Sequence, residues 1–173
     1  HPRVLLPENQ KKYMMAACQV IPSRTPGIKN VKDITQLRFS EDLVNWTIEP
    51  PCLSTERGGP DDYQVWAPGV AYKDGTYYMY YTGVNIHVAQ SICLATSTDL
   101  YHWKKYEGNP VVLPGDWTDW RADRWSDCRD AMVFTDDDGK AYMYYCTSRR
   151  TESGGYRPAL GVAASSDMVH WQD

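Results

Sequence analysis

One short stretch of this 173-residue chain concentrates side chains that could bind and process a sugar. Residues 114–125 hold three Trp, three Asp and two Arg, and the chain then runs into Arg129 and Asp130. Aromatic rings stack on the apolar faces of sugars, and a carboxylate can bind hydroxyl groups or stabilise positive charge. The pattern predicts a carbohydrate subsite, with the alternative that the tryptophans fill gaps between packed elements. The expected aromatic walls are Trp117, Trp120 and Trp125.

A signature that occurs three times defines the elements that must position these residues. It has the form Asp-x-x-(Asn/His)-Trp and begins at Asp42, Asp99 and Asp167. A Tyr-Met pair precedes each copy, at Tyr13, Tyr78 and Tyr142. Self-similarity at a long period indicates a repeat architecture. Because a repeated residue usually has a repeated packing role, the signature tryptophans are expected to be structural.

The repeated unit predicts a four-stranded β-sheet. It contains a strand, a tight turn, a second strand, a longer loop, a third strand and a short outer strand after the Trp. Two copies of the tight turn contain Asp-Gly, which is typical of hairpins, and no window shows sustained helical spacing. Four-stranded units of this period are propeller blades, so we expect an all-β, β-propeller fold. Blades are expected at about 1–52, 64–113 and 127–173, and a β-sandwich with coincidental repeats is the alternative.

Alignment of the three units places His1, Ala67 and Asp130 at one equivalent position. In a propeller this position lies at the start of the innermost strand, facing the central pocket. Asp130 is the one carboxylate among the three, and a carboxylate there is costly to bury unless it is paired or functional. Trp66, beside Ala67, is predicted to form a pocket wall. His87 lies in a loop between strands and is a candidate substrate contact, although a lone loop histidine often has no such role.

The composition of the chain excludes two classes of partner. The net charge is −4 and no basic stripe is present, so nucleic acid is not the expected ligand. No apolar run approaches the roughly 20 residues of a membrane-spanning helix. No signal peptide is visible, and the compartment is not readable, although a secreted or periplasmic location is compatible with the sequence.

Three further residue types carry weaker signals. The 13 Tyr and 7 Trp, against 2 Phe, suit polar ligands with apolar faces, although most strand tyrosines are expected to line blade interfaces. The five cysteines include no Cys-x-x-Cys pair, which predicts free thiols and no zinc site. A Cys128–Cys146 disulfide across a hairpin is the alternative. Asp61 and Asp62, on the approach to the second blade, are expected to be solvated loop charges, with a place at the pocket rim as the alternative.

Several segments resemble known enzymes. Residues 66–78 are similar to the second blade of glycoside hydrolase family 43. Residues 81–83 and 92–111 resemble the second blade of families 32 and 68, and residues 129–131, Arg-Asp-Ala, resemble the Arg-Asp-Pro motif of their third blade. The resemblance covers nearly the whole chain and is to the clan of five-bladed propeller glycosidases.

The resemblance implies an enzyme that hydrolyses O-glycosidic bonds with two carboxylates. The implied substrates are oligo- or polysaccharides of furanoside, pentoside or fructoside type. In this clan a first-blade Asp is the nucleophile or base, a third-blade Asp stabilises the transition state, and a fourth-blade Glu is the acid. The third-blade role is implied for Asp130, with Arg129 holding that carboxylate or a sugar hydroxyl. No cofactor or catalytic metal is implied, and a structural calcium ion is compatible with the resemblance.

The sequence departs from the clan's pattern in two ways, and both bear on whether a complete catalytic domain is expected. The first-blade position holds His1, and no fourth-blade sequence follows Asp173. A five-bladed propeller needs about 300 residues, so we expect the N-terminal half of a catalytic domain. It would be completed by C-terminal blades or by homo-oligomer formation. The alternatives are a non-catalytic carbohydrate-binding or assembly module, and a glycoside phosphorylase, for which no Arg, Lys and His phosphate cluster is evident.

Overall fold

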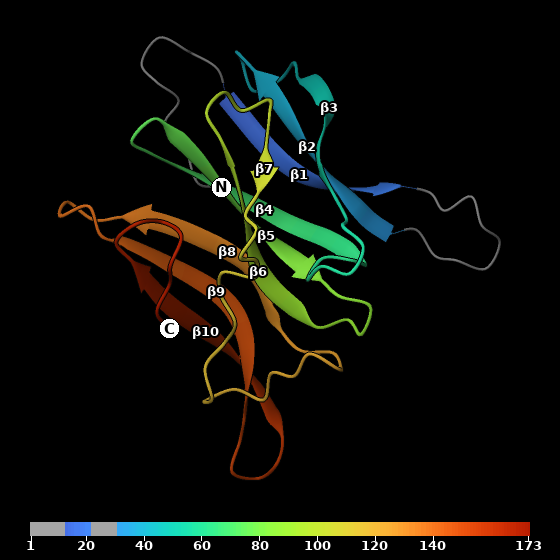
Figure 1. Cartoon of the computed structure of the whole chain (residues 1–173), viewed down its shortest axis with the longest axis vertical. Coiled ribbons are helices and arrows are strands. Elements are labelled where there is room, and N and C mark those ends of the chain that lie inside the picture. The colour runs from blue at the N-terminus through green and yellow to red at the C-terminus, as the bar shows by residue number, and fades with distance from the viewer. Residues whose placement is uncertain (1–12, 22–30) are drawn as a thin grey trace.

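The computed structural model describes residues 13–21 and 31–173, and every regular element in this part of the chain is a β-strand (Figure 1). The strands form three antiparallel sheets, each built from consecutive strands. The predicted all-β, blade-like architecture is therefore confirmed. The same part of the chain contains no helix that could cross a membrane.

The three sheets repeat one strand order. The first contains β1 (Tyr13–Ile21), β2 (Val31–Ser40) and β3 (Thr47–Ser54). The second contains β4 (Gln64–Lys73), β5 (Thr76–Val84), β6 (Gln90–Ser97) and β7 (Lys104–Lys105). The third contains β8 (Cys128–Thr135), β9 (Ala141–Arg150) and β10 (Tyr156–Ser165). The strands β1, β5 and β9 carry the Tyr-Met pair, so the sequence repeat and the sheet order agree.

The short outer strand of the repeat follows the signature Trp in each sheet. It is β3 in the first sheet and β7 in the second. In the third sheet, Gln172 forms an antiparallel bridge with Ala164 at this place. The inner strand expected in the first sheet falls on residues 2–6, which, together with His1, lie outside the described residues.

The Asp of each signature copy closes the same hydrogen-bonded turn, and the signature Trp donates to a backbone carbonyl in the first two copies. In the second sheet, Asp99 Oδ1 accepts the His102 backbone N–H at 2.8 Å, and Asp99 Oδ2 lies 2.6 Å from His102 Nδ1. Trp103 Nε1 donates to the Leu100 carbonyl at 2.7 Å. The hydrogen bonds to the Asp99 carboxylate, first the one from the His102 side chain, lower the pKa of Asp99. The residue after the signature Asp has a positive φ in all three copies, with 64° in Leu43, 69° in Leu100 and 68° in Met168. A backbone geometry that recurs in every copy is expected of a structural motif.

Two apolar clusters join the sheets. One lies between the first and second sheets and includes Leu37 and Met79. The other lies between the second and third sheets and includes Leu94. A Cβ on Gly69 of β4 would lie 2.8 Å from the Ala131 carbonyl oxygen of β8, so the two inner strands approach where only glycine fits. The inner strands thus bring the starts of β4 and β8 together.

The cysteines are free thiols. Cys128 lies opposite Thr147 in the β8–β9 register, whereas Cys146 lies opposite Arg129. All five cysteines are unpaired, so the alternative of a Cys128–Cys146 disulfide is not realised.

Candidate active site

Asp130 occupies a β-bulge at the start of β8. The β8–β9 register shifts between Arg129 and Met132, and Asp130 has a φ of 60° within this shift. The β4–β5 register shifts in the same way, and Ala67 has a φ of 40° there. A left-handed conformation costs a residue with a side chain roughly 1–2 kcal/mol, so both sheets maintain a strained bulge at this point. The two aligned positions share a backbone geometry but differ in their side chains.

The Asp130 carboxylate is open on one side and paired on the other. Its side chain is 47% exposed, and its Oδ2 lies 3.6 Å from Arg129 Nε. The Asp130 backbone N–H donates to Thr82 Oγ1 at 3.1 Å, which ties the bulge to β5. Arg129 is itself held by Asp127 Oδ1 and by Gln90 Oε1, the latter at 2.9 Å. The arginine is therefore fixed, and the exposed side of the carboxylate remains available to a ligand.

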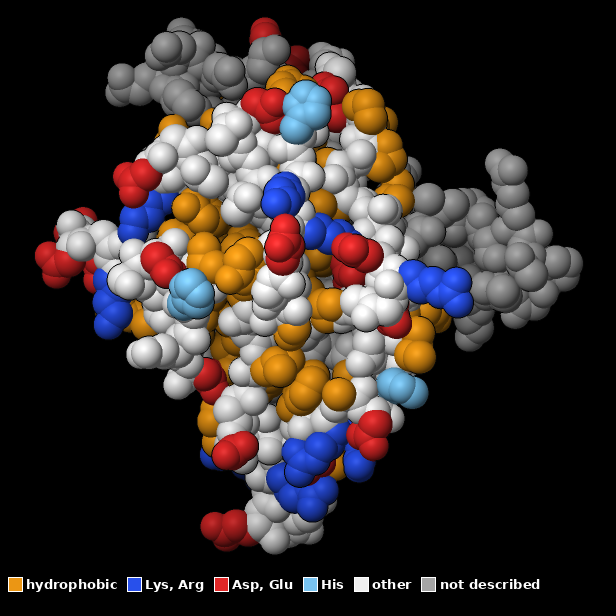
Figure 2. All heavy atoms as spheres, in the orientation of Figure 1, with side chains coloured by type: hydrophobic (Ala, Val, Ile, Leu, Met, Phe, Trp, Pro, Cys, Tyr) orange, Lys and Arg blue, Asp and Glu red, His pale blue; other side chains and the backbone are white. Residues whose placement is uncertain are grey.

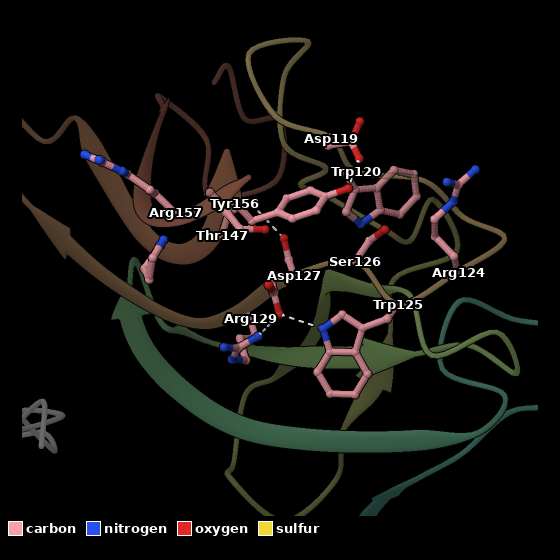
Figure 3. Close-up of a pocket in the computed structure, with 12 residues that line it drawn as sticks. Asp119, Trp120, Arg124, Trp125, Ser126, Asp127, Arg129, Thr147, Tyr156 and Arg157 are labelled. Atoms are coloured by element: carbon pink, nitrogen blue, oxygen red, sulfur yellow. Dashed lines mark hydrogen bonds and ion pairs between the residues drawn. The ribbon is translucent and has the colours of Figure 1, made fainter. Parts of the chain in front are cut away.

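A cavity of about 380 Å³ lies next to this pair (Figure 3). Its walls come from the loop before β8, from the start of β8 and from the adjoining ends of β9 and β10. Arg129 lines the cavity and is also the neighbour of Asp130. The lining residues are Asp119, Trp120, Arg124, Trp125, Ser126, Asp127, Arg129, Thr147, Ser148, Tyr156, Arg157 and Pro158.

Hydrogen bonds fix the aromatic side chains that line the cavity. Trp125 Nε1 donates to Asp127 Oδ1 at 3.2 Å, and Trp120 Nε1 donates to a β6 backbone carbonyl at 2.7 Å. The Tyr156 hydroxyl donates to Asp119 Oδ2 at 2.8 Å and is the main reason that the pKa of Asp119 is lowered. Trp125 and Tyr156 are exposed and can stack on a sugar, whereas Trp120 also packs against the apolar cluster between the second and third sheets.

Three residues predicted as substrate contacts lie outside the cavity lining. Trp117 Nε1 donates to Asp173 Oδ2 at 2.8 Å. Trp66 Nε1 donates to Gln64 Oε1 at 2.6 Å on β4. His87 is exposed in the loop between β5 and β6. Of the predicted candidates, Arg129, Trp120 and Trp125 come together around the cavity, with Asp130 directly beside it.

Sequence reasoning missed Asp127, Tyr156 and Arg157 as part of this cavity. Asp127 lies three residues before Asp130 in the sequence, and this position could have identified it as a cavity residue. Tyr156 and Arg157 are distant in sequence and reach the cavity because β10 pairs with the end of β9, where Tyr156 lies opposite Arg150. Only the strand register carries that information. Across residues 13–21 and 31–173, no group of three His, Cys, Asp or Glu side chains forms a metal site.

The expectation for Asp61 was wrong. It is 1% exposed, because Lys105 Nζ lies 2.5 Å from its Oδ2 and the Tyr81 hydroxyl donates to the same oxygen at 2.9 Å. A buried carboxylate with an ammonium and a hydroxyl partner is stable where an unpaired one is not. Asp62, by contrast, accepts the Ile86 backbone N–H at 2.9 Å in an exposed contact.

The blade-like sheets and the carboxylate in the β8 bulge define a partial β-propeller of the glycosidase type. The family model described as Glycosyl hydrolases family 43 matches residues 25–158. The chain belongs to glycosyl hydrolase family 43.

The chain is also similar to several known proteins. The chain is 30% identical over 116 residues to a β-xylosidase of Bacillus subtilis, covering 62% of this chain and 19% of that protein. Its fold matches fructan 1-exohydrolase IIa from Cichorium intybus, with a TM-score of 0.74 and 22% identity over 94% of this chain and 29% of that one. It also matches a thermostable family-43 glycoside hydrolase, with a TM-score of 0.71 and 22% identity over 98% of this chain and 49% of that one. At these identities the two structures support the fold alone, and the chain spans half or less of each protein's length.

Proposed function

We propose that this chain forms part of a glycoside hydrolase in which Asp130 is the transition-state-stabilising carboxylate. The observation that carries the proposal is the pair of equivalent bulges in β4 and β8. Both adopt positive φ, but the β8 bulge holds a half-exposed carboxylate where the β4 bulge holds Ala67. Because the two sheets share the bulge, the feature that distinguishes the third sheet is the carboxylate that its bulge presents beside the cavity.

The proposed role of Asp130 is electrostatic. Cleavage of a glycosidic bond passes through an oxocarbenium-like transition state that carries positive charge on the sugar ring. A fixed carboxylate near that ring stabilises the charge without reorganising during the reaction. Arg129 supports this role because its ties to Asp127 and Gln90 hold it in place beside Asp130. Proton transfer is assigned to carboxylates other than Asp130.

The proposed substrates are pentosides, furanosides or fructosides. The match to family 43 and the similarity to a protein named β-xylosidase favour a pentose at the glycosidic bond that is cleaved. The test is hydrolysis by the full-length protein of nitrophenyl β-xyloside, nitrophenyl α-arabinofuranoside and sucrose. Turnover of at least one substrate supports the proposal. Sugar binding without turnover of any of them would support a non-catalytic carbohydrate-binding module instead.

We also propose that the outer face of the third sheet is covered by a further blade. Ile92 and Leu94 of β6 are fully buried against the third sheet. Leu160 and Val162 hold the same places relative to their signature Asp, yet they are 67% and 45% exposed. Met132, Phe134 and Tyr144 are exposed as well. A contiguous apolar face of this kind marks an interface.

A further blade is favoured as the occupant because the packing between the second and third sheets would simply be repeated. A protein that extends beyond Asp173 by another blade should then be monomeric. The 173-residue chain on its own should instead associate through this face and bury more than roughly 1,000 Å². Light scattering distinguishes the two, and a monomeric 173-residue chain would contradict the interface.

A further inference from the structure

We propose that Gln90 is a positioning residue of the active site, which holds the Arg129 guanidinium in place beside Asp130 at a cost to the stability of the fold. This inference rests on the proposed function and adds to it a residue of the second sheet. It is carried by the hydrogen bonds of Gln90, by an unpaired donor on its side chain and by the different residues that the other two sheets hold at the equivalent position.

Gln90, the first residue of β6, connects the second sheet to the cavity wall at three points. Its Oε1 accepts from Arg129 Nη1 at 2.9 Å, and its backbone carbonyl accepts from Trp120 Nε1 at 2.7 Å. Its backbone N–H donates to the Ser126 carbonyl at 3.0 Å. All three partners line the cavity, whereas Gln90 itself is 0% exposed. A fully buried residue behind the wall therefore holds part of that wall in place.

The side-chain amide of Gln90 is hydrogen-bonded at its oxygen but not at its nitrogen. Its Nε2 is buried and has no hydrogen-bond partner among the described residues. A guanidinium has donors and no acceptor, so the amide must present its oxygen to Arg129 and cannot pair its nitrogen there instead. A buried donor without a partner lowers the stability of a fold. Stability alone therefore does not favour a glutamine here, and the contact that its side chain does make is with Arg129.

The repeat gives no packing reason for a glutamine at this place. Gln90 precedes its signature Asp by nine residues, and the residue at the same distance is Asp33 in the first sheet and Pro158 in the third. Two residues further along the same strands, the second and third sheets both hold an apolar residue, Ile92 and Leu160. A glutamine occurs only in the sheet whose β6 contacts Arg129, which favours a role in the site over a role in the shared fold.

The contact with Gln90 fixes the orientation of Arg129. Arg129 Nη1 carries two N–H groups and donates both to Gln90 Oε1 and to Asp127 Oδ1. Because the guanidinium is planar, two acceptors at one of its ends restrict the rotation of the whole group, whose Nε lies 3.6 Å from Asp130 Oδ2. Figure 3 shows Asp127 and Arg129 joined at the cavity. Without Gln90, Asp127 alone would hold Nη1, and the guanidinium could turn away from Asp130.

The fixed orientation of one guanidinium, rather than positive charge itself, distinguishes this site. Figure 2 shows Lys and Arg side chains gathered at the lower end of the molecule, where Figure 1 shows the β9–β10 hairpin. Arg124 and Arg157 also line the cavity. Arg124, however, pairs with Asp123 in an exposed contact, and the guanidinium of Arg157 points away from the cavity in Figure 3. Among these three arginines, within the described part of the chain, Arg129 is the one that a fully buried side chain holds.

The test is Gln90→Met in the full-length protein, which keeps an unbranched side chain and removes the amide. The backbone hydrogen bonds to Ser126 and Trp120 remain, so only the contact with Arg129 is lost. We expect kcat to fall about tenfold on whichever of nitrophenyl β-xyloside, nitrophenyl α-arabinofuranoside and sucrose the protein hydrolyses. The midpoint temperature of unfolding should stay within about 2 °C of wild type, because the unpaired donor is removed together with the acceptor. Arg129, which is 33% exposed, can bind water instead.

A second measurement follows Arg129 directly and needs no turnover. In nitrogen-15-labelled protein, the Arg129 Nε–H should exchange with water about tenfold faster in Gln90→Met than in wild type, because the guanidinium is less firmly held. Loss of the NMR signal in Arg129→Lys assigns it. Gln90→Glu keeps an oxygen at the same place and should restore slow exchange. Gln36→Met, in β2 of the first sheet, makes the same chemical change elsewhere and should alter neither kcat nor this signal.

The outcomes separate this inference from the proposed function. Normal turnover by Gln90→Met, or an Arg129 signal that exchanges as slowly as in wild type, would overturn the positioning role while hydrolysis stands. A loss of stability that accounts for the loss of turnover, with the Arg129 signal unchanged, would make Gln90 a packing residue and overturn the role as well. If the wild-type protein hydrolyses none of the three substrates, the proposed function fails, and the Arg129 signal alone then decides whether Gln90 positions this arginine.

Discussion

The buried Asp61–Lys105 pair yields a sharp prediction about stability. The two side chains are 2% and 18% exposed, and the ammonium lies 2.5 Å from the carboxylate. Lys105→Met keeps most of the apolar stem but leaves the carboxylate buried without its cation. Loss of one partner of a buried pair costs roughly 3–5 kcal/mol, because the remaining charge is uncompensated. For a domain of this size, 3 kcal/mol corresponds to a Tm lower by roughly 6–12 °C.

Asp61→Asn should lower the free energy of unfolding by less than Lys105→Met does. Asp61→Asn still offers an oxygen to the Tyr81 hydroxyl, and Lys105 retains Glu56 Oε2 at 3.7 Å and some access to water. We expect a loss of roughly 1–3 kcal/mol. The double variant Asp61→Asn/Lys105→Met should lose less than the sum of the two single variants, since it leaves no unpaired charge.

The assay is equilibrium unfolding in urea, followed by tryptophan fluorescence. Lys104→Met is the matched control, because Lys104 is the neighbouring residue of β7 and its side chain is exposed. It should change the free energy of unfolding by less than about 0.5 kcal/mol. The reasoning would be refuted if Lys105→Met cost no more than Lys104→Met, or if the double variant were strictly additive.

Three further predictions follow from burial and contacts. Trp125→Ala should weaken oligosaccharide binding by about 1–2 kcal/mol in a calorimetric titration, whereas Trp117→Ala, outside the cavity lining, should not; equal effects would contradict the assigned walls. Burial raises the pKa of the Cys93 thiol to about 12, so a thiol reagent at pH 8 should label the half-buried Cys146 and spare Cys93 until the protein unfolds. The stability that Cys93 contributes should be present below the unfolded thiol pKa of about 8.5 and be lost as the pH rises through about 12, which pH-dependent urea melts would detect. Leu160→Glu should reduce self-association of the 173-residue chain in light scattering, and unchanged association would argue against the apolar face as the interface.

The repeat made the fold predictable from the sequence. The turn around Asp99 is closed by contacts within seven residues, from Ser97 to Trp103, so its sequence and structure correspond directly. The Lys73–Thr76 register confirms the tight Asp-Gly hairpin for the same reason. Local hydrogen bonding determines such elements, and three copies of one pattern indicate how they are arranged.

The site was predictable where it depends on the repeat or on the loop before β8, whose composition indicated Trp120 and Trp125. The equivalence of Asp130 and Ala67 came from alignment, and the two bulges share their backbone geometry. Arg157 could not be placed in this way, because it reaches the cavity only through the pairing of β10 with β9. Asp61 was misjudged because its partner Lys105 is distant in sequence and enters from the short outer strand. Contacts between distant segments carry no local sequence signal.

The most direct test of the account is the turnover of Asp130→Asn in the full-length protein. The substitution keeps the shape of the side chain and removes its charge, so it should leave folding intact and lower kcat by a factor on the order of 10²–10³. Asp137→Asn, in the exposed β8–β9 turn, is the matched control and should retain normal kcat. The account predicts this loss for Asp130→Asn alone, and normal turnover by Asp130→Asn on the enzyme's own substrate would contradict it.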